Sequence, residues 1–306
     1  MYLGLDIGGS SVKMGIVDQS GRILRKGEAP VDQDAYRTPI LETVIREADA
    51  FMGEERDRIR GIGVSATGQV DDRTGVIVGT NGKIRNYEGG QIVREMQAAF
   101  GIPTAALNDA NAAVLGEHFR GAARGEDDVI MITLGTGVGG GIIMNGELYG
   151  GSRGIAGELG HFTLYQDGAP CACGKRGCYE SYASTSALVH EAEMLLGETG
   201  LNGRKLFERA EAGEEAVQVV LDRWIDDIAA GLTGLVHIFN PRLLVVGGGV
   251  SEQETLLMQP LRERVLRGVM PRFAEGLRLV RAELGNDAGM IGAVRFFMLR
   301  EGEQKT

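Results

Sequence analysis

The chain has 306 residues, of which 43% are hydrophobic and 24% charged, a composition typical of globular proteins that argues against disorder and fibrous architectures. Its formal net charge of −10 argues against nucleic acid and anionic membranes as partners. A chain longer than about 250 residues usually divides into domains, so we expect two domains with a cleft between them. Because no apolar run is long enough to span a bilayer, and Asp6 interrupts any signal-peptide pattern, we expect a cytoplasmic protein.

The first part of the chain predicts a sheet built from a hairpin followed by alternating helices and strands. Two apolar runs, Tyr2–Asp6 and Val12–Val17, flank a glycine turn and predict the hairpin. Hydrophobic periodicity predicts the next elements: a strand at 23–29, a helix at 36–52, a strand at 59–65, a helix at 91–99, a strand at 104–107 and a helix at 110–119. The alternation predicts a mostly parallel sheet flanked by helices.

From Asp128 the opening pattern repeats, with a strand at 129–134, a glycine turn and a strand at 139–144. A repeat at a separation of about 125 residues indicates a duplicated domain and not a solenoid. The remaining elements are a largely helical region at 188–239, a strand at 242–246, a helix at 253–267, a strand at 277–281 and a helix from 288. We therefore expect an α/β fold with one domain at 1–116 plus the C-terminal helix 288–303, and a second at 117–287.

Two glycine-rich turns are candidate phosphate contacts, because glycine lets backbone N–H groups approach an anion closely. A nucleoside could lie against the bare backbone of a third glycine run, which follows a strand and precedes a helix. One such turn could be only a tight turn, but two related ones favour nucleotide binding. Neither of the first two turns fits the P-loop, and neither precedes a helix as the dinucleotide fingerprint requires. The candidate residues are Asp6, Gly8, Gly9 and Ser10 in the first turn, Gly135, Thr136 and Gly137 in the second, and Gly247 and Gly248 in the third.

Two aspartates follow predicted strands and have two possible roles each. Asp6 could hold Mg²⁺ beside nucleotide phosphates, or it could only cap the hairpin turn. The pair Asn108-Asp109 begins a predicted helix, for which both residue types are good N-caps. Phosphoryl transfer to an alcohol also needs a carboxylate near the attacking hydroxyl, and Asp109 is placed for that. The spacing leaves both roles of Asp109 open.

The three cysteines of the chain, Cys171, Cys173 and Cys178, are close together and follow His161. One histidine and three cysteines supply the four ligands of a tetrahedral Zn²⁺ site, whereas a disulfide would leave one thiol over. With all four ligands from protein, no position is open for a catalytic water, so the predicted zinc is structural. Glu158 and Glu180 flank this cluster and are either acceptors for sugar hydroxyls or solvated surface residues.

Taken together, these motifs resemble the ROK family (repressor, open reading frame, kinase), whose enzymes use the sugar-kinase branch of the actin-like ATPase fold. The resemblance covers nearly the whole chain. Its motifs are Asp6-Ile-Gly-Gly-Ser10, with Ser10 where Thr is commoner, Leu134-Gly-Thr-Gly137, Val246-Gly-Gly-Gly249, Glu158-Leu-Gly-His161 and Cys171-Ala-Cys-Gly-Lys-Arg-Gly-Cys-Tyr-Glu180.

The resemblance implies that Asp109 is the general base for a sugar hydroxyl, commonly the 6-hydroxyl, as it attacks the γ-phosphate of MgATP. It implies that His161 serves zinc through one ring nitrogen and sugar through the other, and that the protein is a homodimer or homotetramer. The implied sugar contacts are Gly68, Asn81, Asn108, Glu158, His161 and Glu180.

The segment 79–87 departs from the commonest glucokinase pattern, since it lacks a tryptophan that many members have at the sugar site. Glucose is therefore favoured only narrowly over N-acetylmannosamine, a β-glucoside, fructose or another hexose. The family also contains repressors with an N-terminal helix-turn-helix; because the first phosphate motif already begins at Asp6, we do not expect such a domain here. A sugar sensor without activity would not require Asp109, so we expect a kinase.

Overall fold

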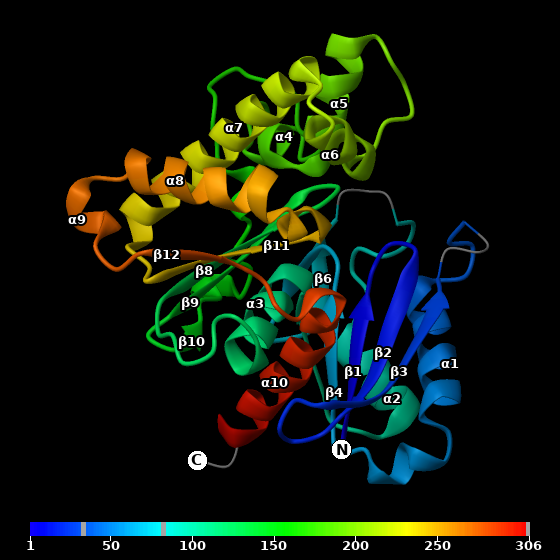
Figure 1. The fold of residues 1–306 in the computed structure, drawn as a ribbon. Helices are drawn as coiled ribbons and strands as arrows, with labels where there is room; N and C mark the ends of the chain where they lie inside the picture. The colour runs from blue at the N-terminus through cyan, green and yellow to red at the C-terminus, as the bar shows by residue number, and fades with distance from the viewer. Residues whose placement is uncertain (32–34, 81–83, 304–306) are drawn as a thin grey trace. The chain divides into compact units, whose positions relative to one another are not determined.

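The computed structural model describes residues 1–31, 35–80 and 84–303, which form two compact units. The first unit contains Met1–Gly125, Glu147–Gly157 and the residues from Asn286 onward, and the second contains Glu126–Gly146 and Glu158–Gly285. Each has its own sheet and its own hydrophobic core (Figure 1). The domain boundaries expected from the sequence stay a prediction.

The sheet of the first unit has the strand order β3-β2-β1-β4-β7. The expected hairpin is confirmed, since β1 and β2 pair antiparallel from Tyr2 opposite Val17 to Ile7 opposite Val12. β4 and β7 continue the sheet in parallel with β1. The strands are β1 (Tyr2–Ile7), β2 (Ser11–Val17), β3 (Ile23–Pro30), β4 (Ile62–Ala66) and β7 (Thr104–Asn108).

Helices cover both faces of this sheet (Figure 1). On one face, alternate β1 residues such as Leu3 and Leu5 share a buried core with the helices α1 (Ile40–Met52) and α2 (Ile92–Phe100). On the other face lie α3 (Asp109–Arg120) and α10 (Ala288–Glu303), which pack closely on each other. Successive side chains of a strand point to opposite faces of the sheet. Because helices cover both faces here, β1 is apolar almost throughout.

Glycines in the central strands bring α10 close to the sheet. A Cβ added at Gly63 would lie 2.2 Å from the carbonyl oxygen of Ala293. We expect Gly63→Ala to lower the free energy of unfolding by about 3 kcal/mol, because backbone must move to relieve that overlap. Gly234→Ala is the matched control: within the described structure its Cβ would meet nothing within 4 Å, and we expect no loss. Equal urea midpoints for the two variants would contradict this packing.

The second unit repeats the topology of the first, which confirms the duplication. Its sheet has the order β10-β9-β8-β11-β12, where β10 is Glu147–Leu148, with β8 and β9 antiparallel and β11 and β12 parallel to β8. The order β2-β1-β4-β7 of the first unit has the same directions. The strands are β8 (Val129–Leu134), β9 (Val138–Met144), β11 (Leu243–Gly247) and β12 (Arg278–Arg281).

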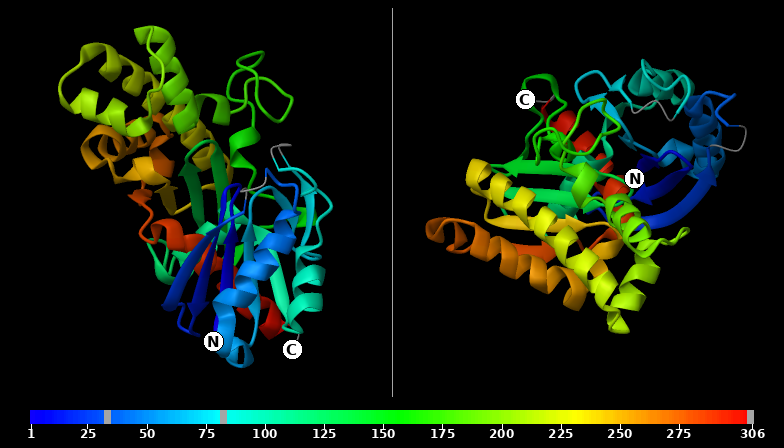
Figure 2. Two further views of the ribbon diagram at one scale, coloured as in Figure 1. Left: turned by 90° about the vertical axis from the view of Figure 1, so that its right-hand side faces the viewer. Right: turned by 90° about the horizontal axis from the view of Figure 1, so that it is seen from above.

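Helices of the second unit build its core on the sheet. The two helices α7 (Glu215–Phe239) and α8 (Gln259–Gly268) lie side by side (Figure 2). Trp224 of α7 is 1% exposed, and its Nε1 donates to the carbonyl oxygens of Ala183 and Ser184 at 3.0 Å, so it holds the junction of α4 and α5. The shorter helices of this unit are α4 (Glu180–Ala183), α5 (Thr185–Leu196), α6 (Gly203–Glu211) and α9 (Pro271–Ala274).

Several boundaries differ from the sequence expectations. The helix expected from residue 36 begins at Ile40, because Pro39 occupies the N-cap position and the residue before a proline avoids helical backbone. The helix expected from residue 253 opens with a π-helical turn, Glu254–Met258, before α8 and its Pro260. The loop after β4 contains an unexpected hairpin of β5 (Gln69–Asp71) and β6 (Val76–Gly79).

The segment Glu147–Gly157 holds a short strand, β10 (Glu147–Leu148), and a turn of 3₁₀ helix at Gly151–Arg153. A longer 3₁₀ turn, Gly53–Arg58, follows α1, and β4 begins at Ile62, later than the expected residue 59. In the described part of the chain, no helix has the length and apolar character needed to cross a membrane.

Candidate functional site

Asp6 lies near the end of β1 with its carboxylate largely enclosed. Ser65 Oγ donates to Asp6 Oδ1 at 2.6 Å, and a Cβ added at Gly289 would lie 2.8 Å from the same oxygen, so the carboxylate packs on the first turn of α10. Burial raises the pKa of Asp6, against the opposing effects of the Ser65 hydrogen bond and the charge of Lys13. A buried carboxylate gains from a nearby cation, which fits a role beside Mg²⁺.

The first glycine turn joins β1 and β2. Gly8 N–H donates to the Ser11 carbonyl at 2.9 Å, which closes the turn. The carbonyl of Ser10 accepts from Val31 N–H at 2.9 Å, and the carbonyl of Gly9 accepts from the Tyr36 hydroxyl. Because these two carbonyl oxygens are held by protein donors, an anion at the exposed turn would be repelled less by them.

Asn108 is the N-cap of α3, and Asp109 is the first residue of that helix. Asn108 Oδ1 accepts from Ala110 N–H at 2.9 Å and Asn111 N–H at 3.1 Å. Its Nδ2 donates to the Gly68 carbonyl and to Asp109 Oδ1, both at 2.9 Å. The side chain of Asn108 thus fixes both the loop at Gly68, where φ is 89°, and the carboxylate of Asp109.

Tyr87 is a residue near this group that the sequence patterns did not single out. It is 1% exposed, and within the described structure its hydroxyl has no hydrogen-bond partner. Burial raises the pKa of Tyr87, and the charges of Asp109 and Asp6 raise it further. Asn81, the other residue expected from this segment, lies outside the described residues.

The second glycine turn, in the second unit, is bound to the residues that follow the cysteine cluster. Gly135 N–H donates to the Gly137 carbonyl at 3.0 Å, and the Gly135 carbonyl accepts from Thr185 N–H at 2.9 Å. Glu180 Oε2 accepts from Val138 N–H at 2.9 Å. The turn that contains Thr136 is therefore held by the start of α4 and the start of α5.

Gly137 has no room for a side chain in this arrangement. A Cβ there would lie 2.3 Å from Glu180 Oε2, so Gly137→Ala must displace the carboxylate and break its bond to Val138 N–H. We expect the ligand-free variant to lose about 1 kcal/mol of stability, the value of one hydrogen bond. Gly135→Ala is the control, because within the described structure its Cβ would meet nothing within 4 Å. Identical thermal unfolding of the two variants would contradict the Glu180 contact.

The third glycine segment packs against the end of β8. Gly248 has φ of 93°, and a Cβ there would lie 2.1 Å from the Leu134 carbonyl oxygen, so only glycine fits. A Cβ at Gly247 would approach the Met131 side chain to 2.9 Å. These contacts bring the second and third glycine segments together within the second unit.

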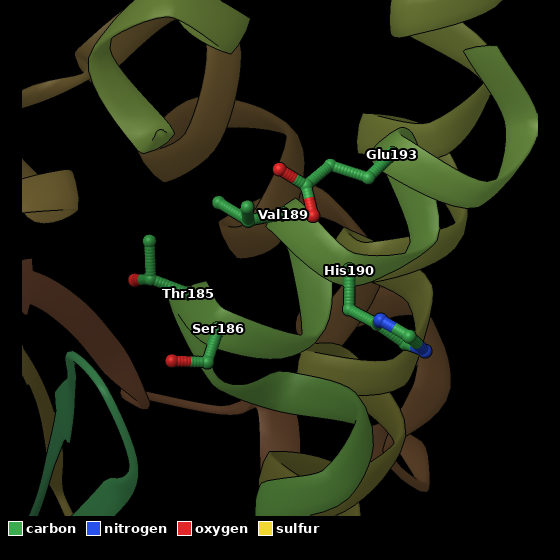
Figure 3. Close-up of a pocket in the computed structure, with 5 residues that line it drawn as sticks. All are labelled: Thr185, Ser186, Val189, His190 and Glu193. Atoms are coloured by element: carbon green, nitrogen blue, oxygen red, sulfur yellow. The ribbon is translucent and has the colours of Figure 1, made fainter. Parts of the chain in front are cut away.

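A shallow hollow of about 240 Å³ lies along the first turns of α5 (Figure 3). It is bordered by two hydroxyl side chains, one apolar side chain, an imidazole and a carboxylate. These are Thr185, Ser186, Val189, His190 and Glu193. Because Thr185 also bonds the second glycine turn, the hollow adjoins the expected phosphate contacts.

The expected metal ligands are brought together. The side chains of His161, Cys171, Cys173 and Cys178 offer ligand atoms that all lie within 4.8 Å of one another. His161 Nδ1 is 3.6 Å from Cys171 Sγ, and Cys173 Sγ is 3.5 Å from Cys178 Sγ. Burial raises the pKa of Cys178 to about 12, with the neighbouring thiols adding to the shift. Thiols this close ionise together only with a cation between them, so the donor set fits Zn²⁺.

Both flanking glutamates lie beside this cluster, as expected. His161 Nε2, the ring nitrogen not facing the thiols, is 3.9 Å from Glu158 Oε2. Glu180 Oε1 is 4.0 Å from Cys171 Sγ, while its other oxygen holds the glycine turn. The first unit thus carries Asp6, Gly8, Gly9, Ser10, Gly68, Asn108 and Asp109, and the second carries the remaining described candidates.

Comparisons with known proteins agree with these motifs. The model of the ROK family matches residues 2–299. The chain is 33% identical to a glucokinase of Thermotoga maritima and 32% identical to a β-glucoside kinase of Listeria monocytogenes, in each case over 98% of both chains. It superimposes on the structure of a ROK family glucokinase from Streptomyces griseus in complex with glucose and AMPPNP with a TM-score of 0.80 and 32% identity, covering 96% of this chain and 98% of the other.

Proposed function

The chain belongs to the ROK family, and we propose on that basis that it is an ATP-dependent kinase of a hexose, with glucose as the favoured substrate. Its fold is the actin-like ATPase fold of ROK sugar kinases. The observation that carries the proposal is the arrangement around Asp109, whose carboxylate is held at the first turn of α3 by Asn108 Nδ2 and Ala110 N–H.

In this proposal Asp109 removes the proton from the sugar 6-hydroxyl as that oxygen attacks the γ-phosphate. A positioned carboxylate of this kind contributes about 10²- to 10⁴-fold to the rate. Asp6 acts beside Mg²⁺, and the turns at Gly8–Ser10 and Gly135–Gly137 bind phosphates. Closure of the protein over both substrates would exclude water, which otherwise would hydrolyse ATP.

The second half of the proposed substrate site consists of Glu158, His161 and Glu180. Their support is the proximity of both carboxylates to the cysteine cluster, where Glu158 lies beside the outward ring nitrogen of His161. Zn²⁺ would be held by His161 and the three cysteines and would fix this region without taking part in the reaction. The hollow along α5 and the segment Gly247–Gly248 are proposed to receive the nucleoside.

A β-glucoside is the second candidate substrate, because the β-glucoside kinase relative is nearly as similar to this chain as the glucokinase relative, at 32% against 33% identity. A coupled ADP-release assay with MgATP and a panel of sugars separates the two. The panel contains glucose, cellobiose, N-acetylmannosamine, fructose, mannose and N-acetylglucosamine. Strong stimulation by glucose supports the proposal, and stimulation by cellobiose alone replaces it with the alternative. The absence of any stimulation with zinc-replete protein would favour a sugar sensor.

Three further properties are part of the proposal. The cysteine cluster needs reduced thiols, which supports a cytoplasmic location. The net charge of −10 supports small-molecule substrates over nucleic acid or membrane partners. Assembly as a homodimer or homotetramer rests on the family resemblance alone.

A further inference from the structure

Asn111 is a buried polar residue that the proposed chemistry does not use. It lies in the first turn of α3, two residues after Asp109, and is 4% exposed. Its backbone N–H donates to Asn108 Oδ1 at 3.1 Å, so its backbone belongs to the same cap that holds Asp109. The position of the Asn111 side chain is therefore fixed relative to the proposed base.

The side-chain amide of Asn111 reaches a distant segment of the chain. Asn111 Nδ2 donates to the carbonyl oxygen of Ala156 at 3.1 Å. Because a carbonyl only accepts, this bond fixes the orientation of the amide with its nitrogen toward Ala156. Asn111 Oδ1 is buried and, in the described part of the chain, has no hydrogen-bond partner. An unpaired buried acceptor costs stability, so the bond to Ala156 is kept against that cost.

Ala156 lies in the segment Glu147–Gly157, which packs on the first unit although the chain before and after it belongs to the second. A second contact holds the same segment: a Cβ added at Gly154 would lie 2.3 Å from the carboxylate of Asp72. Within the segment, Ala156 N–H donates to the Gly150 carbonyl at 3.1 Å. Residues 154–156 of the segment are thus held on the first unit by Asp72 and Asn111.

Glu158 lies two residues after Ala156. Two residues of extended chain span about 7 Å at most, so the carbonyl held by Asn111 limits where Glu158 can lie. The residue between them, Gly157, has φ of 100°, which lets the backbone turn sharply at that position. Loss of the anchor at Ala156 would therefore remove a limit on where the backbone of Glu158 can lie.

We infer that Asn111 is a positioning residue of the sugar site, tying the segment that leads into Glu158 to the helix that begins with Asp109. This inference rests on the proposed function, in which Glu158 contacts the sugar and Asp109 accepts its proton. Misplacement of a substrate contact by about 1 Å can cost up to about 10²-fold in rate. Loss of the hydrogen bond from Asn111 to Ala156 is expected to misplace Glu158 and so to have a large effect on the reaction with sugar.

Hydrogen exchange and steady-state kinetics on the full chain test the inference. The variant Asn111→Leu keeps a similar volume and removes the donor. We expect backbone exchange of Ala156 and its neighbours to rise at least about tenfold, and the KM for sugar to rise at least about tenfold. The KM for MgATP should stay within about twofold, which a general loss of structure would not produce. Val114→Ala, at a fully buried residue of the same helix, is the control for general destabilisation. In this variant, backbone hydrogen exchange at residues 147–157 should not rise more than it does elsewhere in the chain.

Unchanged exchange at 147–157 in Asn111→Leu would overturn the anchoring role whether or not the protein is a sugar kinase. A local rise in exchange with an unchanged sugar KM would overturn the link to the sugar site. Wild-type protein without sugar-dependent ADP release would instead refute the proposed function, while the exchange result would still stand. If Asn111→Leu does not fold, Asn111→Ser, which stays polar but is too short to reach Ala156, is judged by the same outcomes.

Discussion

Replacing Asp109 by asparagine is expected to lower the turnover number at least about a hundredfold while leaving sugar affinity largely intact. Asparagine keeps an oxygen that can accept from Ala110 N–H, as Asp109 Oδ1 now does at 2.8 Å, so the start of α3 should be preserved. What the variant loses is the basicity of the carboxylate, which the proposed proton transfer needs. The loss should therefore fall on kcat and not on sugar binding.

The measurement is kcat from ADP release together with the sugar Kd from titration calorimetry. Asp49→Asn is the matched control: Asp49 lies on α1, is paired with Arg56 at 2.9 Å and is 56% exposed, so kcat should change less than about twofold. A near-normal kcat for Asp109→Asn would remove Asp109 from the role of general base. A sugar Kd weakened as much as kcat would instead assign it to binding.

Cys173→Ser is expected to remove the zinc and to loosen the region between Glu158 and Glu180. A structural zinc in a small cysteine and histidine site contributes on the order of 10 kcal/mol of apparent binding free energy. Cys173 is exposed, so its replacement removes a ligand with little loss of buried packing. Ala172→Ser adds the same hydroxyl at the neighbouring exposed residue, which is not a ligand, and serves as the control.

Metal analysis of freshly purified protein, with limited proteolysis, checks this expectation. Wild type and Ala172→Ser should hold about one zinc per chain. Cys173→Ser should hold almost none and should be cut within the cysteine segment. Wild-type protein without zinc, or Cys173→Ser with a full complement, would contradict the metal assignment. Loss of zinc without new cleavage would show that the metal does not order this region.

Local patterns in the sequence predicted much of the fold. The hairpin at Tyr2–Val17 and its repeat from Val129 follow from apolar runs on either side of glycine turns, and both were found. The clustering of His161 with the cysteines was also predictable, because ligands close in sequence need only tight turns to meet. Errors occurred where one residue overrides periodicity, as Pro39 does at the start of α1.

The sequence did not predict contacts between residues far apart in the chain. The bond from Asn111 to Ala156 and the bond from Glu180 to Val138 N–H join different elements, and no periodicity encodes them. Tyr87 gave no signal because an aromatic residue in a loop has no pattern that predicts its burial. The hairpin of β5 and β6 was missed because its strands are very short.

Identification of the reaction product tests the central proposal most directly. The protein is incubated with MgATP and glucose, and the product is examined by ³¹P NMR and mass spectrometry, with 6-deoxyglucose in a parallel reaction. The proposal predicts a hexose 6-phosphate from glucose and no phosphorylated sugar from 6-deoxyglucose. No phosphorylated sugar from glucose or from any other sugar of the panel, with zinc bound, would contradict it.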